Sequence, residues 1–315
     1  MGKSVDKQRA PEIDLYALLP YGLSVRIARL AAVLTLLAAF AAGACDRPAA
    51  GSRETRRVVC LTPSSTELVA AVGAVDRIVA VDQFSAFPPE VRKLPKVGDF
   101  LSPNLEAILA QHPDIVVVDA VQTEVARTLS SHGIRTLGVP MQTVDDVRAG
   151  LVTVGRALGR EPEARAAVAR LDADLRDVGA LGARALAERG RRPRVLFVVD
   201  RQVGGLGNLV AAGPGTYLDE LLRRAGADNV LADSPVRYAK ITAEEVIARA
   251  PDVILDAVHA PDAAAARADW SVLASVPAVK SGRVHVLADA VFVSPGPRLG
   301  EALRRLAPLI WDITP

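Results

Sequence analysis

The chain has 315 residues, of which 50% are hydrophobic and 23% are charged, and its formal net charge is only +2. This apolar content excludes a disordered chain, and the length favours two domains over one. The charge excess lies in residues 1–44, which carry five basic and three acidic side chains, so the remaining residues are balanced. A balanced chain argues against a nucleic-acid groove, because neutralising phosphates requires a basic patch.

Residues 1–44 are predicted to be a lipoprotein-type signal peptide. Leu30–Ala44 contains 15 uncharged, mostly apolar residues after two arginines, which is shorter than the ~20 residues of a membrane-spanning helix. The small residues before Cys45 resemble the lipobox of bacterial lipoproteins, so Cys45 is the predicted lipidation site. An ordinary secretory cleavage that leaves Cys45 free stays open. Asp46 resembles the signal that retains such lipoproteins at the inner membrane.

After a predicted tether at residues 45–55, strand-like apolar runs alternate with helical patterns. Strands are predicted at Val58–Leu61, Ile78–Val81, Ile115–Val118 and Ile134–Val139. Helices are predicted at Ser65–Val72, Asn104–Gln111 and Glu124–Ser131. This alternation is typical of a parallel sheet covered by helices, and it predicts an α/β lobe over residues 56–158. Cys60, in the first strand, is expected to be a small core residue.

The next segment is rich in alanine, leucine, arginine and acidic residues and predicts two helices. The first runs over Val144–Leu158, and the second begins at Pro162, because proline is tolerated in the first turn of a helix. The second helix continues to about Arg189 and would reach ~40 Å at 1.5 Å per residue, enough to cross from one domain to another. Residues 159–190 are therefore the predicted interdomain helix.

The βα pattern then resumes and predicts a second α/β lobe over residues 191–315. Its strands are predicted at Val195–Val199, Val253–Leu255 and Val284–Leu287. Its helices are predicted at Thr216–Ala225, Ala243–Arg249 and Arg298–Ile310.

The two lobes share an internal repeat, in which Asn104–Val116 aligns with Thr242–Ile254 at an offset of 138 residues. Each copy reads as a helix that stops before a Pro-Asp pair and leads into a core strand. Glu106 and Glu244 fall at equivalent positions in the first helical turn. Two explanations stay open: stabilisation of the helix dipole, or a pair of surface acids that bind a partner with two equivalent basic sites.

Four further segments stand out along the chain: Arg57–Glu67, the Phe87-Pro88-Pro89 loop, Val97–Glu106 and Ala212–Thr216. Taken in this order, they resemble the helical-backbone (class III) substrate-binding proteins of ABC importers, which serve vitamin B12, ferric siderophores and haem. The resemblance implies two Rossmann-like lobes with parallel sheets, joined by one long helix, with the ligand in the cleft between them. It also implies a periplasmic monomer whose partner is a permease dimer with its ATPase. In that family a glutamate on each lobe docks onto permease arginines, and Glu106 and Glu244 match those glutamates.

The candidate ligand contacts are aromatic and basic residues in loops at strand ends. Exposed aromatic side chains often mark a contact surface. The aromatic candidates are Phe84, Phe100, Tyr238 and Phe292, and the basic candidates are Arg201 and Arg298. The first three aromatic positions match positions that line the cleft of the B12 binders. The alternatives are that the aromatics pack onto their own lobes and that Arg298 is a structural residue at a helix start.

Other chemistry is poorly supported by the sequence. No HExxH or GxSxG motif and no P-loop occurs, so no resident metal or cofactor is predicted. Haem is disfavoured, because Phe100 and Leu101 stand where haem-binding relatives carry an iron-ligating tyrosine. Asp119 and other strand-end aspartates could act in a hydrolase, but such residues are common in turns.

The expected function is a lipid-anchored substrate-binding protein for a metal chelate, with a corrinoid as first choice and a ferric siderophore as second. An exported two-lobed α/β hydrolase and a chelate sensor are the alternatives.

Overall fold

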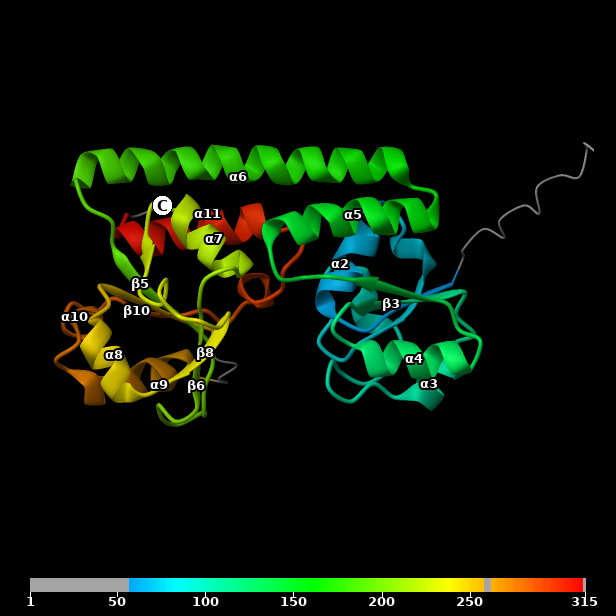
Figure 1. Cartoon of the computed structure of the whole chain (residues 1–315), viewed down its shortest axis with the longest axis horizontal. Helices are drawn as coiled ribbons and strands as arrows, with labels where there is room; N and C mark the ends of the chain where they lie inside the picture. Colours follow the sequence, from blue (N-terminus) through cyan, green and yellow to red (C-terminus); the bar gives the residue numbers. More distant parts are fainter. Residues whose placement is uncertain (1–56, 258–261, 314–315) are drawn as a thin grey trace, which may run out of the picture. The chain divides into compact units, whose positions relative to one another are not determined.

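The computed structural model describes residues 57–257 and 262–313, which belong to one compact unit that begins at Glu54 (Figure 1). The predicted signal peptide, Cys45 and the tether lie outside the described residues. Within the described ranges, no helix is both long and apolar enough to cross a bilayer.

The first lobe is built on a parallel four-stranded sheet of order β2-β1-β3-β4. Its strands are β1 (Val58–Cys60), β2 (Ile78–Val81), β3 (Ile115–Asp119) and β4 (Thr136–Val139). Its helices are α2 (Pro63–Ala71), α3 (Leu105–Ala110), α4 (Thr123–Ser131) and α5 (Val144–Leu158). Alternate residues of β1 and β3 pack against α2 and α5 on one face and against α3 and α4 on the other. Cys60 is fully buried in this core, as predicted.

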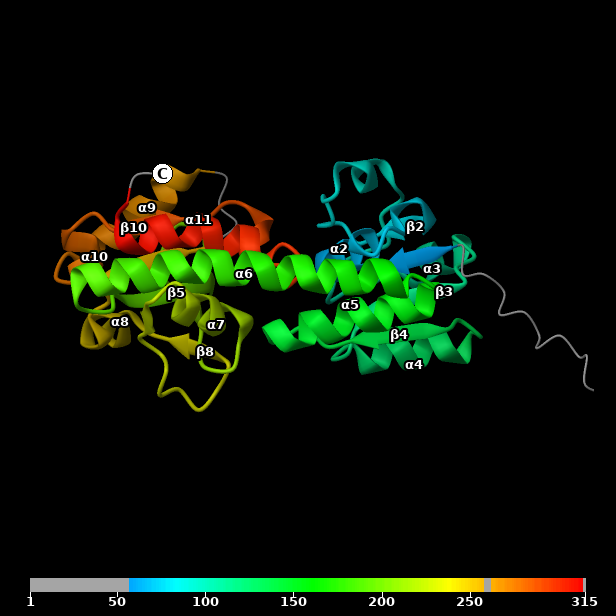
Figure 2. The same cartoon turned by 90° about the horizontal axis from the view of Figure 1, so that it is seen from above.

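Helix α6 (Glu161–Arg189) runs along both lobes (Figure 2). It packs against α2 and α5 of the first lobe and against α7 (Tyr217–Arg224) and α11 (Leu299–Trp311) of the second. Gly182 permits its close approach to α7, because an added Cβ would lie 2.5 Å from the carbonyl carbon of Ala225. The predicted long helix from Pro162 is therefore present, one residue longer at its start.

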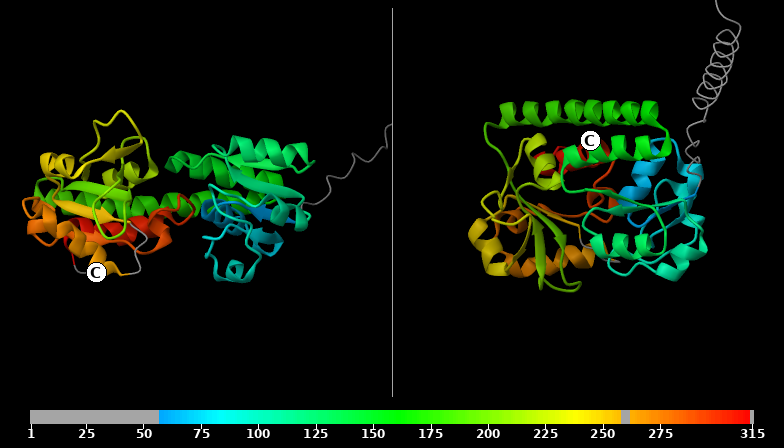
Figure 3. Two further views of the ribbon diagram at one scale, coloured as in Figure 1. Left: turned by 90° about the horizontal axis from the view of Figure 1, so that it is seen from below. Right: turned by 45° about the vertical axis from the view of Figure 1, so that its right-hand side comes forward.

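The second lobe is coloured yellow-green to red in Figure 3. It contains a six-stranded sheet whose main order is β10-β9-β5-β6-β8, with β7 paired to β5. Its strands are β5 (Arg194–Asp200), β6 (Leu209–Ala212), β7 (Asp228–Asn229), β8 (Tyr238–Ile241), β9 (Val253–Asp256) and β10 (Val284–Val286). Besides α7 and α11, its helices are α8 (Ala243–Arg249), α9 (Ala263–Ala268) and α10 (Pro277–Lys280).

The structure corrects the expectation of a wholly parallel sheet in this lobe. Strands β10, β9 and β5 are parallel, but β6 runs antiparallel to both β5 and β8. An antiparallel neighbour needs only a short connection, and the glycine-rich segment 201–208 supplies one. Strands β6 and β8 were not predicted, because half of the residues in each are Ala or Lys, which are weak strand formers.

The repeat is visible as equivalent geometry in the two lobes. His112 and Ala250, 138 residues apart, both have positive φ angles, 46° and 44°. The carboxylate of Asp114 accepts a hydrogen bond at 3.0 Å from the N–H of Arg57, just before β1, and that of Asp252 accepts one at 2.9 Å from the N–H of Arg194, the first residue of β5. In each copy the helix is thus followed by a residue in the left-handed conformation, and the aspartate makes the same backbone hydrogen bond to the neighbouring strand.

Candidate ligand cleft and docking surface

A cavity of about 330 Å³ lies between the two lobes. The first lobe contributes Thr62, Ser64, Phe100, Asp119, Met141 and Gln142, and the second contributes Val199, Tyr217, Leu218, Tyr238, Val293 and Pro295. Several of these residues end or follow strands at the carboxyl edge of a sheet, which is where α/β proteins commonly bind ligands. The size and mixed lining suit a small-molecule site.

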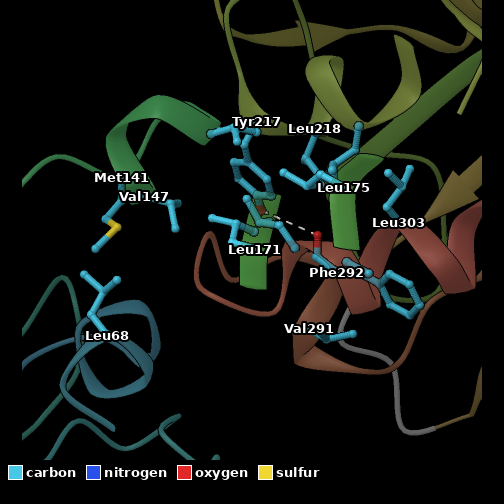
Figure 4. Close-up of a cluster of buried hydrophobic side chains, with 14 of the residues drawn as sticks. Leu68, Met141, Val147, Leu171, Leu175, Tyr217, Leu218, Val291, Phe292 and Leu303 are labelled. Carbon is cyan, nitrogen blue, oxygen red and sulfur yellow. Dashed lines mark hydrogen bonds between the residues drawn. The ribbon is translucent and has the colours of Figure 1, made fainter. Parts of the chain in front are cut away.

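The cleft rests on a hydrophobic cluster that is continuous between the lobes (Figure 4). Leu68 and Met141 come from the first lobe, Leu171 and Leu175 from α6, and Tyr217 from the second lobe. All of these side chains are buried. Opening the lobes widely would expose this surface to water, so the apolar floor favours small lobe movements.

Direct hydrogen bonds also join the lobes beside the cavity. The backbone N–H of Tyr217, at the start of α7, donates to the carbonyl of Gln142 at 2.7 Å. The N–H of Val144, at the start of α5, donates to the carboxylate of Glu220 at 3.3 Å. The amino ends of two helices from different lobes are therefore held together at the cavity.

A buried ion pair forms a further bridge between the lobes. The guanidinium of Arg298, at the start of α11, binds both carboxylate oxygens of Glu67 in α2, at 2.6 and 3.1 Å. It also lies 3.9 Å from the ring centroid of Phe87. Burial raises the pKa of Glu67 even though Arg298 opposes the shift. Arg298, predicted as a ligand contact, does not line the cavity and instead takes the structural alternative.

Phe100 and Tyr238 face the cavity from opposite lobes, and their side chains are 40% and 38% exposed. Phe84 is also exposed but is not among the cavity-lining residues. Hydrogen bonds hold the loop of Phe84 in place, because Asp82 accepts from the N–H of Phe84 and from the hydroxyl of Ser85. Of the four aromatic candidates, the structure thus brings two together at the cavity.

Phe292 and Arg201 are not placed to contact a ligand in the cleft. Phe292 is buried in the core, where Arg305 lies 4.7 Å from its ring centroid. The Arg201 side chain is fully buried and pairs with Asp256 at 2.9 Å and Asp269 at 2.8 Å. The cleft prediction for these two residues is corrected, since an internal partner holds each of them.

Several cavity residues, four of which are named here, were missed or given another meaning in the sequence. Met141, Gln142 and Tyr217 carry no motif, and only the spatial neighbourhood of α5 and α7 brings them to the cavity. Asp119 was noted as a strand-end acid, and the structure places it in the cavity wall. Among the described residues, no group of three His, Cys, Asp or Glu side chains could hold a metal ion.

Glu106 and Glu244 are exposed in the first turns of α3 and α8, each away from α6 (Figure 1). The preceding Asn104 and Thr242 cap these helices, accepting hydrogen bonds from the N–H of Ala107 and Glu245. Hydrogen bonds from its own N–H and from the Thr242 side chain lower the pKa of Glu244. Each capping side chain satisfies one N–H of its helix end, and both acids are exposed at the surface.

A sequence profile of the periplasmic binding protein family matches residues 58–291. An uncharacterized ABC transporter substrate-binding lipoprotein, YvrC of Bacillus subtilis, is 29% identical over 83% of this chain and 82% of its own length. The cobalamin-binding protein of Halobacterium salinarum is 30% identical over 83% of this chain and 71% of its own. These relatives are named as binding proteins rather than enzymes.

Solved structures show the same architecture. A periplasmic heme-binding protein from Pseudomonas aeruginosa superposes with a TM-score of 0.75 at 29% identity, covering 83% of this chain and 94% of that one. The match spans both lobes and the helix between them, and the family profile covers most of the described residues. The chain therefore belongs to the periplasmic binding protein family.

Proposed function

We propose that the protein is the substrate-binding component of an ABC importer and captures a metal chelate, with a corrinoid as first choice and a ferric siderophore as second. The observation that carries the proposal is the interlobe cavity, to which each lobe contributes one partly exposed aromatic ring, Phe100 and Tyr238. Such rings can stack on the flat macrocycle of a corrinoid from opposite sides. The name of the Halobacterium salinarum relative supports a cobalamin.

A corrinoid is larger than the 330 Å³ cavity, so its edge would extend to the rim. Phe84 lies exposed in a fixed loop of the first lobe and could cover that edge. Binding would then combine a buried centre with a partly exposed periphery.

Glu106 and Glu244 are the proposed contacts to the permease. They occupy equivalent positions of a repeated unit, one in each lobe, which suits a permease dimer with two equivalent basic sites. Exposed charge pairs of this kind mainly set orientation and association rate.

The proposed location is the periplasm, with Cys45 carrying a lipid anchor. The lipoprotein named among the relatives supports this expectation. Replacing Cys45 with Ser should move the protein from the membrane fraction to the soluble fraction; retention of the variant in the membrane fraction would contradict the anchor.

Ligand titration of the protein without its leader tests the function. Cyanocobalamin and a panel of ferric siderophores and haem are titrated by calorimetry, and one of them should bind below ~10 µM, about −7 kcal/mol. Phe100→Ala and Tyr238→Ala should each weaken binding about tenfold, or ~1.4 kcal/mol. Val272→Ala, at an exposed position of the second lobe outside the cavity, serves as control. Failure of every chelate to bind would reject the proposal.

A further inference from the structure

The described residues that line the cavity include one acid and no basic side chain. The polar lining residues other than Asp119 are Thr62, Ser64, Gln142, Tyr217 and Tyr238, all of which are neutral. Asp119 is the one charged residue among the described residues that line it. A ligand in this cavity therefore meets a carboxylate and no compensating cation.

Asp119 is held firmly in that position. It ends β3, is 9% exposed, and accepts a hydrogen bond from the N–H of Val121 at 3.0 Å. Its own N–H donates to the side-chain oxygen of Gln122 at 3.0 Å, and the Gln122 amide donates to the carbonyl of Phe100 at 2.9 Å. The carboxylate and the aromatic loop of the first lobe are thus fixed to each other.

The surroundings of Asp119 already disfavour a negative charge, so a second anion buried beside it would add to that cost. Burial raises the pKa of Asp119, and the nearby carboxylate of Asp146 acts in the same direction. Burial raises the pKa of Tyr238 on the other lobe; the positive charge of Arg237 opposes this shift, and the carboxylate of Asp119 adds to it, so Asp119 and Tyr238 interact across the cavity.

The arginines nearest the cleft are paired with acids or lie outside the cavity wall. Arg201 is bound by Asp256 and Asp269, and Arg298 by Glu67. Arg237 adjoins Tyr238 but is exposed and does not line the cavity.

We infer that Asp119 is a specificity-determining residue: it selects chelates whose buried edge is uncharged and rich in N–H donors, such as the carboxamides of a corrinoid. It disfavours chelates that bury a carboxylate or catecholate. The physical reason is that like charges repel strongly where water is partly excluded, whereas an amide donates a charge-assisted hydrogen bond to the carboxylate. The inference rests on the proposed function and narrows its substrate class.

The test uses probes that differ by one charge. Cyanocobalamin and its monocarboxylates, in which one peripheral amide is a carboxylate, are titrated into the leader-free protein. At least one monocarboxylate should bind ten- to a hundredfold more weakly than cyanocobalamin. In Asp119→Asn that difference should shrink to threefold or less, and cyanocobalamin itself should bind more weakly, because the asparagine oxygen accepts a weaker hydrogen bond than a carboxylate.

Asp145→Asn provides the matched control, because Asp145 is a highly exposed carboxylate of the same lobe outside the cavity. It should leave the discrimination as in the parent. Asp119→Ser is the second variant if the asparagine variant does not fold. Equal binding of all monocarboxylates by the parent, or unchanged discrimination in the Asp119 variants, would overturn the inference.

The outcome also separates the inference from the proposed function. If no corrinoid binds, a cationic ferric trihydroxamate is compared with a trianionic ferric tris-catecholate, and the former alone should bind. Tight binding of the tris-catecholate or of haem would overturn the role of Asp119 and leave the import function standing. Binding of no chelate at all would overturn both.

Discussion

The ion pair between Glu67 and Arg298 should be a major determinant of stability, because it joins the lobes and is shielded from water. The Glu67 side chain is 4% exposed and that of Arg298 is 18% exposed. Replacing Arg298 with Met keeps much of the side-chain volume but leaves the carboxylate buried without its partner. Such a loss typically costs 3–5 kcal/mol. Since the guanidinium is partly exposed, we expect about 2–3 kcal/mol.

The loss should depend on pH in a defined direction. Burial already raises the pKa of Glu67 in the folded protein, and removing Arg298 raises it further. An acid whose pKa is raised by folding binds protons more tightly in the folded state, so its contribution to stability is present at low pH and is lost as the pH rises through the folded pKa. The deficit of Arg298→Met should therefore be larger at pH 8 than at pH 5.

Chemical denaturation at the two pH values, with the midpoint and slope fitted together, measures the effect. At pH 8 the melting temperature should also fall, by about 5–10 °C for a chain of this size. Arg304→Met is the matched control: it lies in the same helix, and its ion pair with Asp174 is exposed, so it should lose well under 1 kcal/mol. The double variant Glu67→Gln with Arg298→Met should recover part of the loss. Equal losses for Arg298→Met and Arg304→Met, or a loss independent of pH, would refute the reasoning.

Three further outcomes are expected. Gly182→Ala should destabilise the protein by about 1–3 kcal/mol in chemical denaturation, because the added Cβ meets the backbone of α7. Gly179→Ala, one turn away with 3.8 Å of room, should instead be neutral or stabilising by up to about 1 kcal/mol. In a Cys45→Ser background, Cys60 should resist alkylation in the folded state and react only on unfolding, because burial raises its pKa to about 12. The double variant Glu106→Ala with Glu244→Ala should keep ligand affinity but reduce uptake in cells; unchanged uptake would exclude the docking role.

Elements whose residues favour the observed state were predictable even when they are short. The predicted helices Val144–Leu158 and Ala243–Arg249 have the observed bounds, and so does the strand Ile78–Val81. The antiparallel strands β6 and β8 also have four residues but were not predicted, because half of each consists of Ala or Lys, which are weak strand formers, whereas Ile78–Val81 has three β-branched residues. The alternation of strands and helices thus indicated the parallel core, and the edge of the second sheet needed the structure.

The residues of the candidate site could likewise be predicted only in part. Loop position and exposure singled out Phe100 and Tyr238, which do line the cavity. The same rule failed for Phe292, because a three-residue 3-10 helix turns this side chain into the core. It failed for Arg201 because the acids that hold this side chain are 55 and 68 residues away in the sequence. No local pattern reports such distant partners.

The repeat also explains why the two proposed binding surfaces differ in symmetry. The duplicated unit places Glu106 and Glu244 at equivalent positions, and a dimeric permease would need that equivalence. The cavity wall is only partly symmetric: Phe100 and Tyr238 are equivalent positions of the repeat, 138 residues apart, whereas Asp119 corresponds to Ala257, which does not line the cavity. A chelate has no twofold axis, so an asymmetric wall with one carboxylate can fix its orientation. Selection on ligand specificity can therefore alter the cavity without disturbing the paired acids.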